Sequence, residues 1–402
     1  MKKLFLHVIA FYISILGVHA QNTPTTDSSY SLRKLHIDEI NLVSGYYHQD
    51  GDNSAVTGGI GTEKLTDFAN TIDIQVSKYN FKGNKNTFRF ELGVDHYTSA
   101  SSDKIDPNSV SSASMSDTRV YPSLNWTHTN GKTGIAFGFT GSYSHEYDYE
   151  SRGVGVNLTR ISKNKNTQFD AKVNGFFDTW RVILPVELRS ASDGSGSESD
   201  SRGVDMKPRT SFNASLSLSQ VINPRLQALF IIEPAYQQGL LATKYQRDYF
   251  TDGTEKAETL PGKRYKLPVG IRFNYFLDDH FVIRTFYRYY MDDWGVRAHT
   301  AEVEVPVKLN SFFSLSPFYR YYSQQGTRYF TPYGQHNPSA NYFTSDYDLS
   351  TLHSHYVGLN VRTAPPKGVF NIQEFKALEL RYGHYIRSTG LNSNLLTLQL
   401  TF

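Results

Sequence analysis

The chain has no cysteine among its 402 residues. A sequence without cysteine has no disulfide framework, no thiolate metal site, no cysteine-attached haem and no cysteine nucleophile. Basic residues number 41 and acidic residues 38, so the large basic surplus of a nucleic-acid-binding protein is missing as well. We therefore expect no nucleic-acid partner and a fold that is stable without covalent cross-links.

Long apolar runs are missing after residue 20. No later stretch approaches the ~20 apolar residues of a membrane-spanning helix. Residues 1–20, "MKKLFLHVIAFYISILGVHA", combine two lysines, an apolar segment and small residues at the end. This pattern is typical of a secretory signal peptide cleaved before Gln21, with an uncleaved anchor as the alternative. No cysteine follows Ala20, which excludes lipoprotein processing.

Motifs of catalytic and metal sites are also missing. The sequence has no HExxH, no P-loop, no Gly-x-Ser-x-Gly and no EF-hand loop. His353 and His355 are spaced to point to one side of a strand, where they would hold a metal or lie together at a membrane interface. We favour the interface, and we predict no metal, no cofactor and no enzymatic activity.

Aromatic residues and alternating segments are abundant. The chain has 28 Tyr and 26 Phe, yet its mean hydropathy is −0.45. Apolar and polar residues alternate strictly in "TIDIQV" (71–76), "FRFELGV" (88–94), "IAFGFTG" (135–141), "LPVGIRFNY" (267–275) and "LTLQLTF" (396–402). Segments of about 9–13 residues with one apolar and one polar face are typical of strands that cross a bilayer. The sequence predicts an all-β, transmembrane antiparallel β-barrel.

The connections between these segments differ in length. One set is short and rich in turn-forming residues: 84–86, 130–132, 163–166, 223–225, 278–280, 310–311 and 365–368. The other set is often long and polar: about 50–66, 99–117, 180–208, 240–263 and 325–350. Short turns on one side and long loops on the other indicate an outer-membrane barrel. We predict about 16 strands over residues 36–402, periplasmic termini, and a short periplasmic lead over residues 21–35.

The last strand carries an apolar residue at every second position up to Phe402. Closure of the barrel would pair this strand with the first one. Leu398, Leu400 and Phe402 resemble the signal by which outer-membrane barrels are delivered to their assembly machinery. We therefore expect contacts with that machinery and with the lipid of a Gram-negative outer membrane.

Charged residues alternate toward the inner face of the predicted barrel. The candidates for a pore lining are Arg272, Arg284, Arg288, Glu302, Glu304, Arg320, Glu379 and Arg381. One interpretation is a selectivity lining in which arginines attract anions. The other is a network of mutually neutralising charges that fills the interior, which the mixture of signs favours.

A Phe-Tyr-Arg-Tyr-Tyr motif occurs twice, at residues 286–290 and 318–322. Alternation turns its arginines inward and Tyr287, Tyr289, Tyr319 and Tyr321 outward. Tyrosines on the lipid side near the long loops are typical of an interfacial aromatic girdle.

Residues 93–159 carry a resemblance to a known family. The features are the Asp- and Ser/Ala-rich loop over 99–117, Asp117 and Arg119 at the start of the next strand, and the "HEYDYESRGVGV" hairpin. This stretch resembles an uncharacterised bacterial family catalogued as domain of unknown function 3570. The resemblance implies an outer-membrane barrel. It brings no catalytic or binding residues with it, and it leaves the role of loop 99–117 open.

Two functional hypotheses follow. The first is a porin-like channel for small polar solutes, with a polar lumen narrowed by an inward-folded loop. The second is a non-conducting barrel that serves as a scaffold or receptor for an exported periplasmic or surface protein. The number of strands favours the first, and the balanced lumen charge and long Tyr-rich loops favour the second.

Overall fold

The computed structural model describes residues 34–98, 115–189 and 205–402. The predicted signal peptide, most of the predicted periplasmic lead and most of loop 99–117 lie outside these residues. The regular secondary structure of the described part is almost entirely β-strand, as the alternation predicted. No helix in it is long and apolar enough to cross a membrane.

The strands follow one another along the chain with four single-turn 3-10 helices in the connections. Their bounds are β1 His36–Asp50, β2 Leu65–Tyr79, β3 Lys85–Thr98, β4 Ser116–Asn130, β5 Ile135–His145, β6 Tyr149–Ile161, β7 Thr167–Arg181, β8 Met206–Asn223, β9 Leu226–Ile232, β10 Ala235–Gly239, β11 Arg247–Tyr249, β12 Glu255–Ala257, β13 Lys263–Phe276, β14 Val282–Asp292, β15 Arg297–Glu304, β16 Val307–Asn310, β17 Phe313–Gln325, β18 Leu352–Thr363, β19 Ala377–Arg387 and β20 Asn392–Thr401. The 3-10 helices are η1 Ala55–Thr57, η2 Val186–Leu188, η3 Tyr347–Leu349 and η4 Val369–Asn371.

These segments form a closed antiparallel barrel of 16 strands. Two strand positions are split in two. β9 and β10 both pair with β8 and β13, and β15 and β16 both pair with β17. Pro234 and Pro306 lie at the two interruptions. Proline has no N–H to donate to the neighbouring strand, so the ladder breaks there.

The barrel closes between its first and last strands. β1 pairs with β2 on one side and with β20 on the other. Ile40 and Phe402 exchange two backbone hydrogen bonds, of 3.1 and 2.8 Å. The last strand is therefore paired along its whole length. Because the number of strands is even, the start of β1 and the end of β20 lie at the same end of the barrel.

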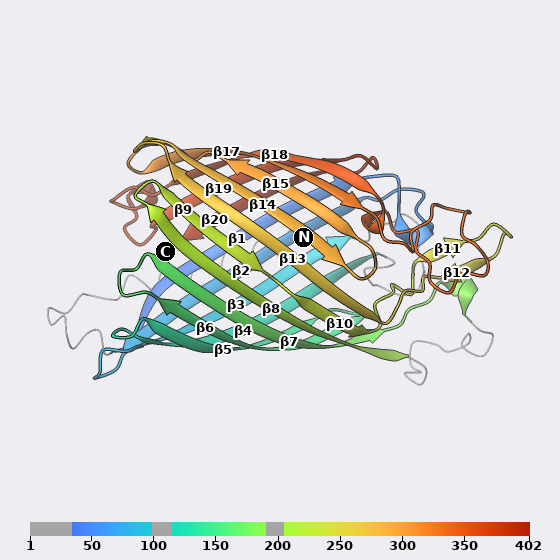
Figure 1. Cartoon of the computed structure of the whole chain (residues 1–402), viewed down its shortest axis with the longest axis horizontal. Helices are drawn as coiled ribbons and strands as arrows, with labels where there is room; N and C mark the ends of the chain where they lie inside the picture. Colours follow the sequence, from blue (N-terminus) through green and yellow to red (C-terminus); the bar gives the residue numbers. More distant parts are fainter. Residues whose placement is uncertain (1–33, 99–114, 190–204) are drawn as a thin grey trace.

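The two ends of the barrel differ as the connection lengths predicted. Short turns join the strands at one end, which we call the short-turn end. At the other end, which we call the long-loop end, the chain folds back over the rim, and the β11–β12 hairpin lies beyond the strands (Figure 1). Several strands exceed the expected length, up to 18 residues in β8, because the ladders continue past the alternating segments.

The outer face of the wall is apolar. Exposed side chains on it include Phe139, Val156, Val269, Leu359 and Leu398, and Tyr287, Tyr319 and Tyr321 are exposed beside them. The structure thus turns outward the faces that the alternation assigned to lipid.

The short-turn end has a small hydrophobic core on the outside of the seam. The β18–β19 connection turns back over it, so that the ring of Phe375 stacks on that of Phe402 with their centres 5.0 Å apart. Ile40, Leu42, Ile72 and Val369 complete the cluster. Phe402 is only 7% exposed, so its side chain is covered by neighbouring protein side chains rather than exposed to lipid.

Candidate functional site

A cavity of about 910 Å³ lies inside the barrel beneath the long loops. Strands on opposite sides of the seam form its wall, and loops close it toward the long-loop end. Its wall residues are Tyr47, Gln49, Leu65, Phe286, Arg288, Thr300, Arg320, Tyr322, Ser354, Tyr356, Tyr385, Arg387, Ser393 and Leu395. Its loop residues are Ser54, Ala55, Val56, Glu63, Tyr245, Gln246, Asp346, Asp348 and Leu391. The cavity has the size and the mixed aromatic and charged lining of a small-molecule site.

Three loops pack against one another above this cavity. We call residues 51–64, 240–262 and 326–351 the loop cap. Arg247 Nη1 donates to Val56 O at 3.1 Å, joining the first two loops. Thr259 and Phe343 exchange backbone hydrogen bonds that join the second and third. Gly59 has φ +84°, and a Cβ there would lie 2.7 Å from Ser345 O, so the first loop meets the third where only glycine fits.

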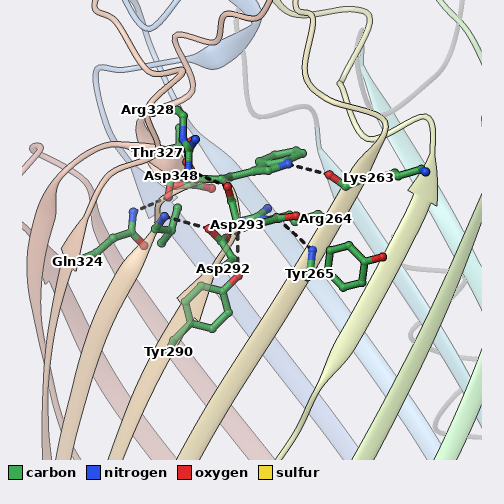
Figure 2. A network of polar contacts seen from close by, with 12 residues as sticks. Lys263, Arg264, Tyr265, Tyr290, Asp292, Asp293, Gln324, Thr327, Arg328 and Asp348 are labelled. Atoms are coloured by element: carbon green, nitrogen blue, oxygen red, sulfur yellow. Dashed lines mark hydrogen bonds and ion pairs between the residues drawn. The ribbon is translucent and has the colours of Figure 1, made fainter.

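A polar network anchors the cap to the rim (Figure 2). Arg264 lies 2.5 Å from Asp292 Oδ2 and 4.3 Å from the centre of the Trp294 ring. Trp294 Nε1 donates to Lys263 O at 3.0 Å, and Thr327 Oγ1 donates to Trp294 O at 3.0 Å. The turn between β14 and β15 thus holds both β13 and the start of the third cap loop.

Arg387 joins the cap to the wall from inside the cavity. Its side chain is 5% exposed. Nη1 donates to Asp348 Oδ1, and Nη2 lies 3.6 Å from Glu63 Oε2, beyond hydrogen-bond distance. Glu63 Oε2 and Arg387 Nε and Nη2 have no hydrogen-bond partner. The guanidinium therefore links two cap loops while one of its edges stays unmatched.

Three carboxyl groups of the cap are held in a poorly solvated environment. Burial raises the pKa of Glu63 to about 7, against the opposing effect of Arg387. Burial, with repulsion from Asp348, raises the pKa of Asp346 to about 7. Burial also raises the pKa of Glu258, deeper in the cap, to about 8. Near neutral pH the cap therefore carries less negative charge than its composition suggests.

The eight predicted pore-lining residues lie on the inner face, but only two of them reach this cavity, namely Arg288 and Arg320. Arg381 and Glu304 show the inward direction directly. They come from β19 and β15, which do not pair, and their side chains lie 3.4 Å apart. Side chains of strands that are not neighbours meet only inside a barrel.

Most of these charges are paired with one another. Arg284 lies 2.9 Å from Glu304, and Arg320 lies 2.6 Å from Glu302. Arg288 lies 3.5 Å from Glu233, and Glu379 lies 3.7 Å from Arg362. Arg272 stacks on Phe286 at 5.3 Å. The arrangement is that of a mutually neutralising network, and a role of these residues in selectivity stays a prediction.

Two histidine clusters of the described residues make side-chain contacts. Tyr319 OH lies 2.7 Å from His355 Nδ1, and the described residues contain no group of three potential metal ligands. In the cap, His336 Nε2 contacts both Ser345 Oγ, at 2.9 Å, and Asp248 Oδ1, at 3.3 Å. A nucleophile triad needs the serine and the carboxylate on different ring nitrogens, so this cluster has a different geometry.

Sequence reasoning did not identify Glu63, Asp348 or Arg387. The signal for Arg387 was present, because it follows Arg381 by an even number of positions on the same strand. Glu63 and Asp348 lie in loops, where no periodicity fixes the direction of a side chain.

Comparison with known proteins identifies a family. The family described as "Protein of unknown function (DUF3570)" matches residues 8–389. This confirms the resemblance found from residues 93–159. No curated protein matches the sequence.

Solved structures with a similar fold are distant in sequence. The siderophore receptor PirA from Acinetobacter baumannii is 11% identical, with a TM-score of 0.46 over 86% of this chain and 52% of the receptor. OccK9 (OpdG) from Pseudomonas aeruginosa is 9% identical, with a TM-score of 0.41 over 92% and 99% of the two chains. A BenF-like porin from Pseudomonas fluorescens Pf-5 is 8% identical, with a TM-score of 0.43 over 91% and 98%. The chain spans about half the length of the receptor.

Proposed function

The chain belongs to the DUF3570 family of proteins of unknown function, and we propose that it is a porin-like outer-membrane channel through which small polar solutes diffuse. The observation that carries this proposal is the cavity of about 910 Å³ between the barrel wall and the loop cap. Its tyrosine, serine, glutamine and charged side chains suit a hydrated polar solute rather than an apolar one.

The wall supports a location in the outer membrane. Its outer face is apolar with exposed tyrosines, and its inner face carries charged and polar side chains, as in transmembrane barrels. A barrel of this strand number leaves room for an aqueous interior. In this proposal the short-turn end and both termini face the periplasm, and Leu398, Leu400 and Phe402 serve the assembly machinery.

The loop cap acts as the constriction in this mechanism. It enters the lumen with Glu63, Asp346 and Asp348, which face the wall arginines Arg288, Arg320 and Arg387. A solute therefore passes between acidic groups of the cap and arginines of the wall, and only a solute small enough for the space beneath the cap is admitted. Movement of the cap would widen the passage.

Conductance in planar lipid bilayers tests the channel. The refolded chain is expected to give stable single-channel steps, with ion selectivity measured from the reversal potential. A matched control is the same preparation after heat unfolding. A folded, heat-modifiable barrel that never conducts contradicts the proposal.

A second candidate is a non-conducting scaffold or receptor, which the order of the cap favours. A hydrophobic cluster packs the cap residues Ala242 and Leu260 against Trp294 of the β14–β15 turn. On its outer surface Tyr333 and Tyr342 are exposed. A partner protein that co-purifies with the silent barrel, and that is lost when residues 332–343 are replaced by a short linker, would support this candidate over the channel.

A further inference from the structure

Two arginines with unmatched buried donors line the cavity. The buried side-chain nitrogens without a hydrogen-bond partner in the described part of the chain are Trp180 Nε1, Arg181 Nε, Arg288 Nε, Arg387 Nε and Arg387 Nη2. The last three belong to the two residues that line the cavity beneath the cap. Buried donors are normally satisfied, so unmatched ones that face a cavity point to a group that binds there.

The unmatched atoms of Arg387 form one complete edge of its guanidinium. Nε–H and one N–H of Nη2 point in the same direction, which is the geometry that binds two oxygens of a carboxylate or phosphate at once. Asp348 takes only Nη1. Glu63 Oε2 stays 3.6 Å from Nη2 and makes no hydrogen bond itself. The protein's own carboxylates therefore make no hydrogen bond to this buried edge, although Glu63 lies at ion-pair distance from Nη2.

We propose that Arg387 is the binding point for an oxyanion group of the transported solute, with Arg288 as a second cationic contact in the same cavity. The ligand class is a small solute that carries a carboxylate or a tetrahedral oxyanion such as a phosphate group. The rings of Tyr47, Tyr322 and Tyr385 line the space beside it. The inference rests on the proposed channel only for the route by which the solute arrives.

Glu63 adds a dependence on pH to this site. The charged groups that act on it are Arg387 from the wall and Asp346 and Asp348 from the third cap loop. Tyr47 of the wall lines the same cavity, and its hydroxyl donates to Gln49 Oε1 at 2.7 Å. When protonated, Glu63 donates a hydrogen bond to a bound oxyanion, and when ionised it repels one. Asp346 acts in the same sense, because burial raises its pKa to about 7 as well.

Equilibrium dialysis of the detergent-solubilised full chain tests the proposal without any need for conduction. The probes are radiolabelled sulfate, a tetrahedral oxyanion, and radiolabelled acetate. Both keep a fixed charge between pH 6 and pH 8. The expected result is saturable binding at a ratio of one, for one or both probes. Preference for acetate identifies a carboxylate solute, and preference for sulfate identifies a phosphate-like one.

Substitutions of Arg387 decide whether its guanidinium holds the anion. Arg387→Ala is expected to weaken binding at least tenfold, and Arg387→Lys nearly as much, because lysine cannot present two parallel donors. The matched control is Arg362→Ala, another inward arginine, which pairs with Glu379 outside the cavity. No binding by the wild-type chain, or equal losses in the control and in R387K, overturns the proposal.

The pH series gives a second test that does not remove the arginine. Affinity is expected to fall about tenfold from pH 6 to pH 8 for one coupled proton. The double variant Glu63→Gln with Asp346→Asn is expected to bind equally at both pH values. A wild-type affinity that does not change with pH overturns the role of Glu63. Conductance is recorded separately, so a barrel that binds but does not conduct rejects the channel and keeps the site.

Discussion

His336 Nε2 lies 3.3 Å from Asp248 Oδ1 in the loop cap, and the two side chains are only 2% and 1% exposed. The pair joins the second cap loop to the third. Apart from this contact, neither carboxylate oxygen of Asp248 has a hydrogen-bond partner. The histidine is therefore the polar side chain in direct contact with a carboxylate held away from water.

The first prediction concerns this pair. His336→Ala removes this contact from a buried carboxylate, and a buried polar group that loses its hydrogen-bonding partner costs about 1–3 kcal/mol. The cost falls on the cap, so we expect faster proteolysis within residues 326–351 while the barrel stays heat-modifiable. His355→Ala, on the outer wall beside Tyr319, is the control and should leave the cap resistant. Equal resistance of H336A and wild type would show that other contacts hold the cap.

The second prediction concerns the aromatic clasp at the seam. Phe375→Ala removes the ring that stacks on Phe402, and loss of a buried Phe ring costs about 3–5 kcal/mol. We expect a lower temperature for the loss of the heat-modifiable form. The control is Phe370→Ala in the same connection, because Phe370 is 79% exposed. If both variants melt alike, the clasp does not stabilise the seam.

The third prediction concerns the stability of the cap as pH changes. Glu63 and Asp346 have pKa values raised to about 7, and Glu258 to about 8. Between the unfolded pKa values, near 4, and these folded values, the closed cap binds more protons than an open one. Its stability therefore falls as pH rises through this window.

We expect the cap to resist protease better at pH 5.5 than at pH 8.5. Glu258→Gln should reduce the difference, because one of the three titrating groups is lost. A second measurement avoids the pH dependence of the protease. It is the protection of residues 243–259 from hydrogen exchange at each pH, corrected for intrinsic exchange rates. Greater protection at the higher pH contradicts the assignment.

The fourth prediction concerns the inward ion pairs. Glu304 lies 2.9 Å from Arg284 and 3.4 Å from Arg381, so Glu304→Gln leaves two arginines less neutralised. We expect the anion-to-cation permeability ratio to rise by a factor of about two to five, the equivalent of about 0.5–1 kcal/mol for a partly exposed pair. The control is Lys308→Gln. Lys308 lies in β16, which continues the line of β15 toward the short-turn end, and its substitution removes a charge of the opposite sign. A ratio that is unchanged in E304Q would mean that this layer does not set the selectivity.

The wall was predictable from the sequence and the cap was not. Alternation in "NLLTLQLTF" gave the strand and its outward face, because the side-chain period of a strand leaves only two choices. It gave the inward direction of Arg284 and Arg381 for the same reason. The contacts of Glu63 and Asp348 depend on loops that have no period. Their positions follow only from packing between segments far apart in the chain, such as Thr259 with Phe343.

The candidate site shows the same division. Arg288 and Arg320 were found because they lie within repeated strand motifs. The Nε–Nη2 edge of Arg387 could not be found in this way. Whether its donors have hydrogen-bond partners depends on the positions of Asp348 and Glu63 in the folded protein. No property of a strand contains that information.

The cap and the wall meet across the seam, and this has a consequence for folding. Asn53 Nδ2 donates to Thr389 O across 336 positions of sequence, and Glu63 faces Arg387 in the same region. Contacts of such separation form late, because the chain entropy of closing so long a loop is lost first. A sheet that has not yet closed has neither a ring nor an assembled anion site. Oxyanion binding would therefore occur only after the barrel has closed. A ligand at this site would stabilise the closed barrel and slow its reopening.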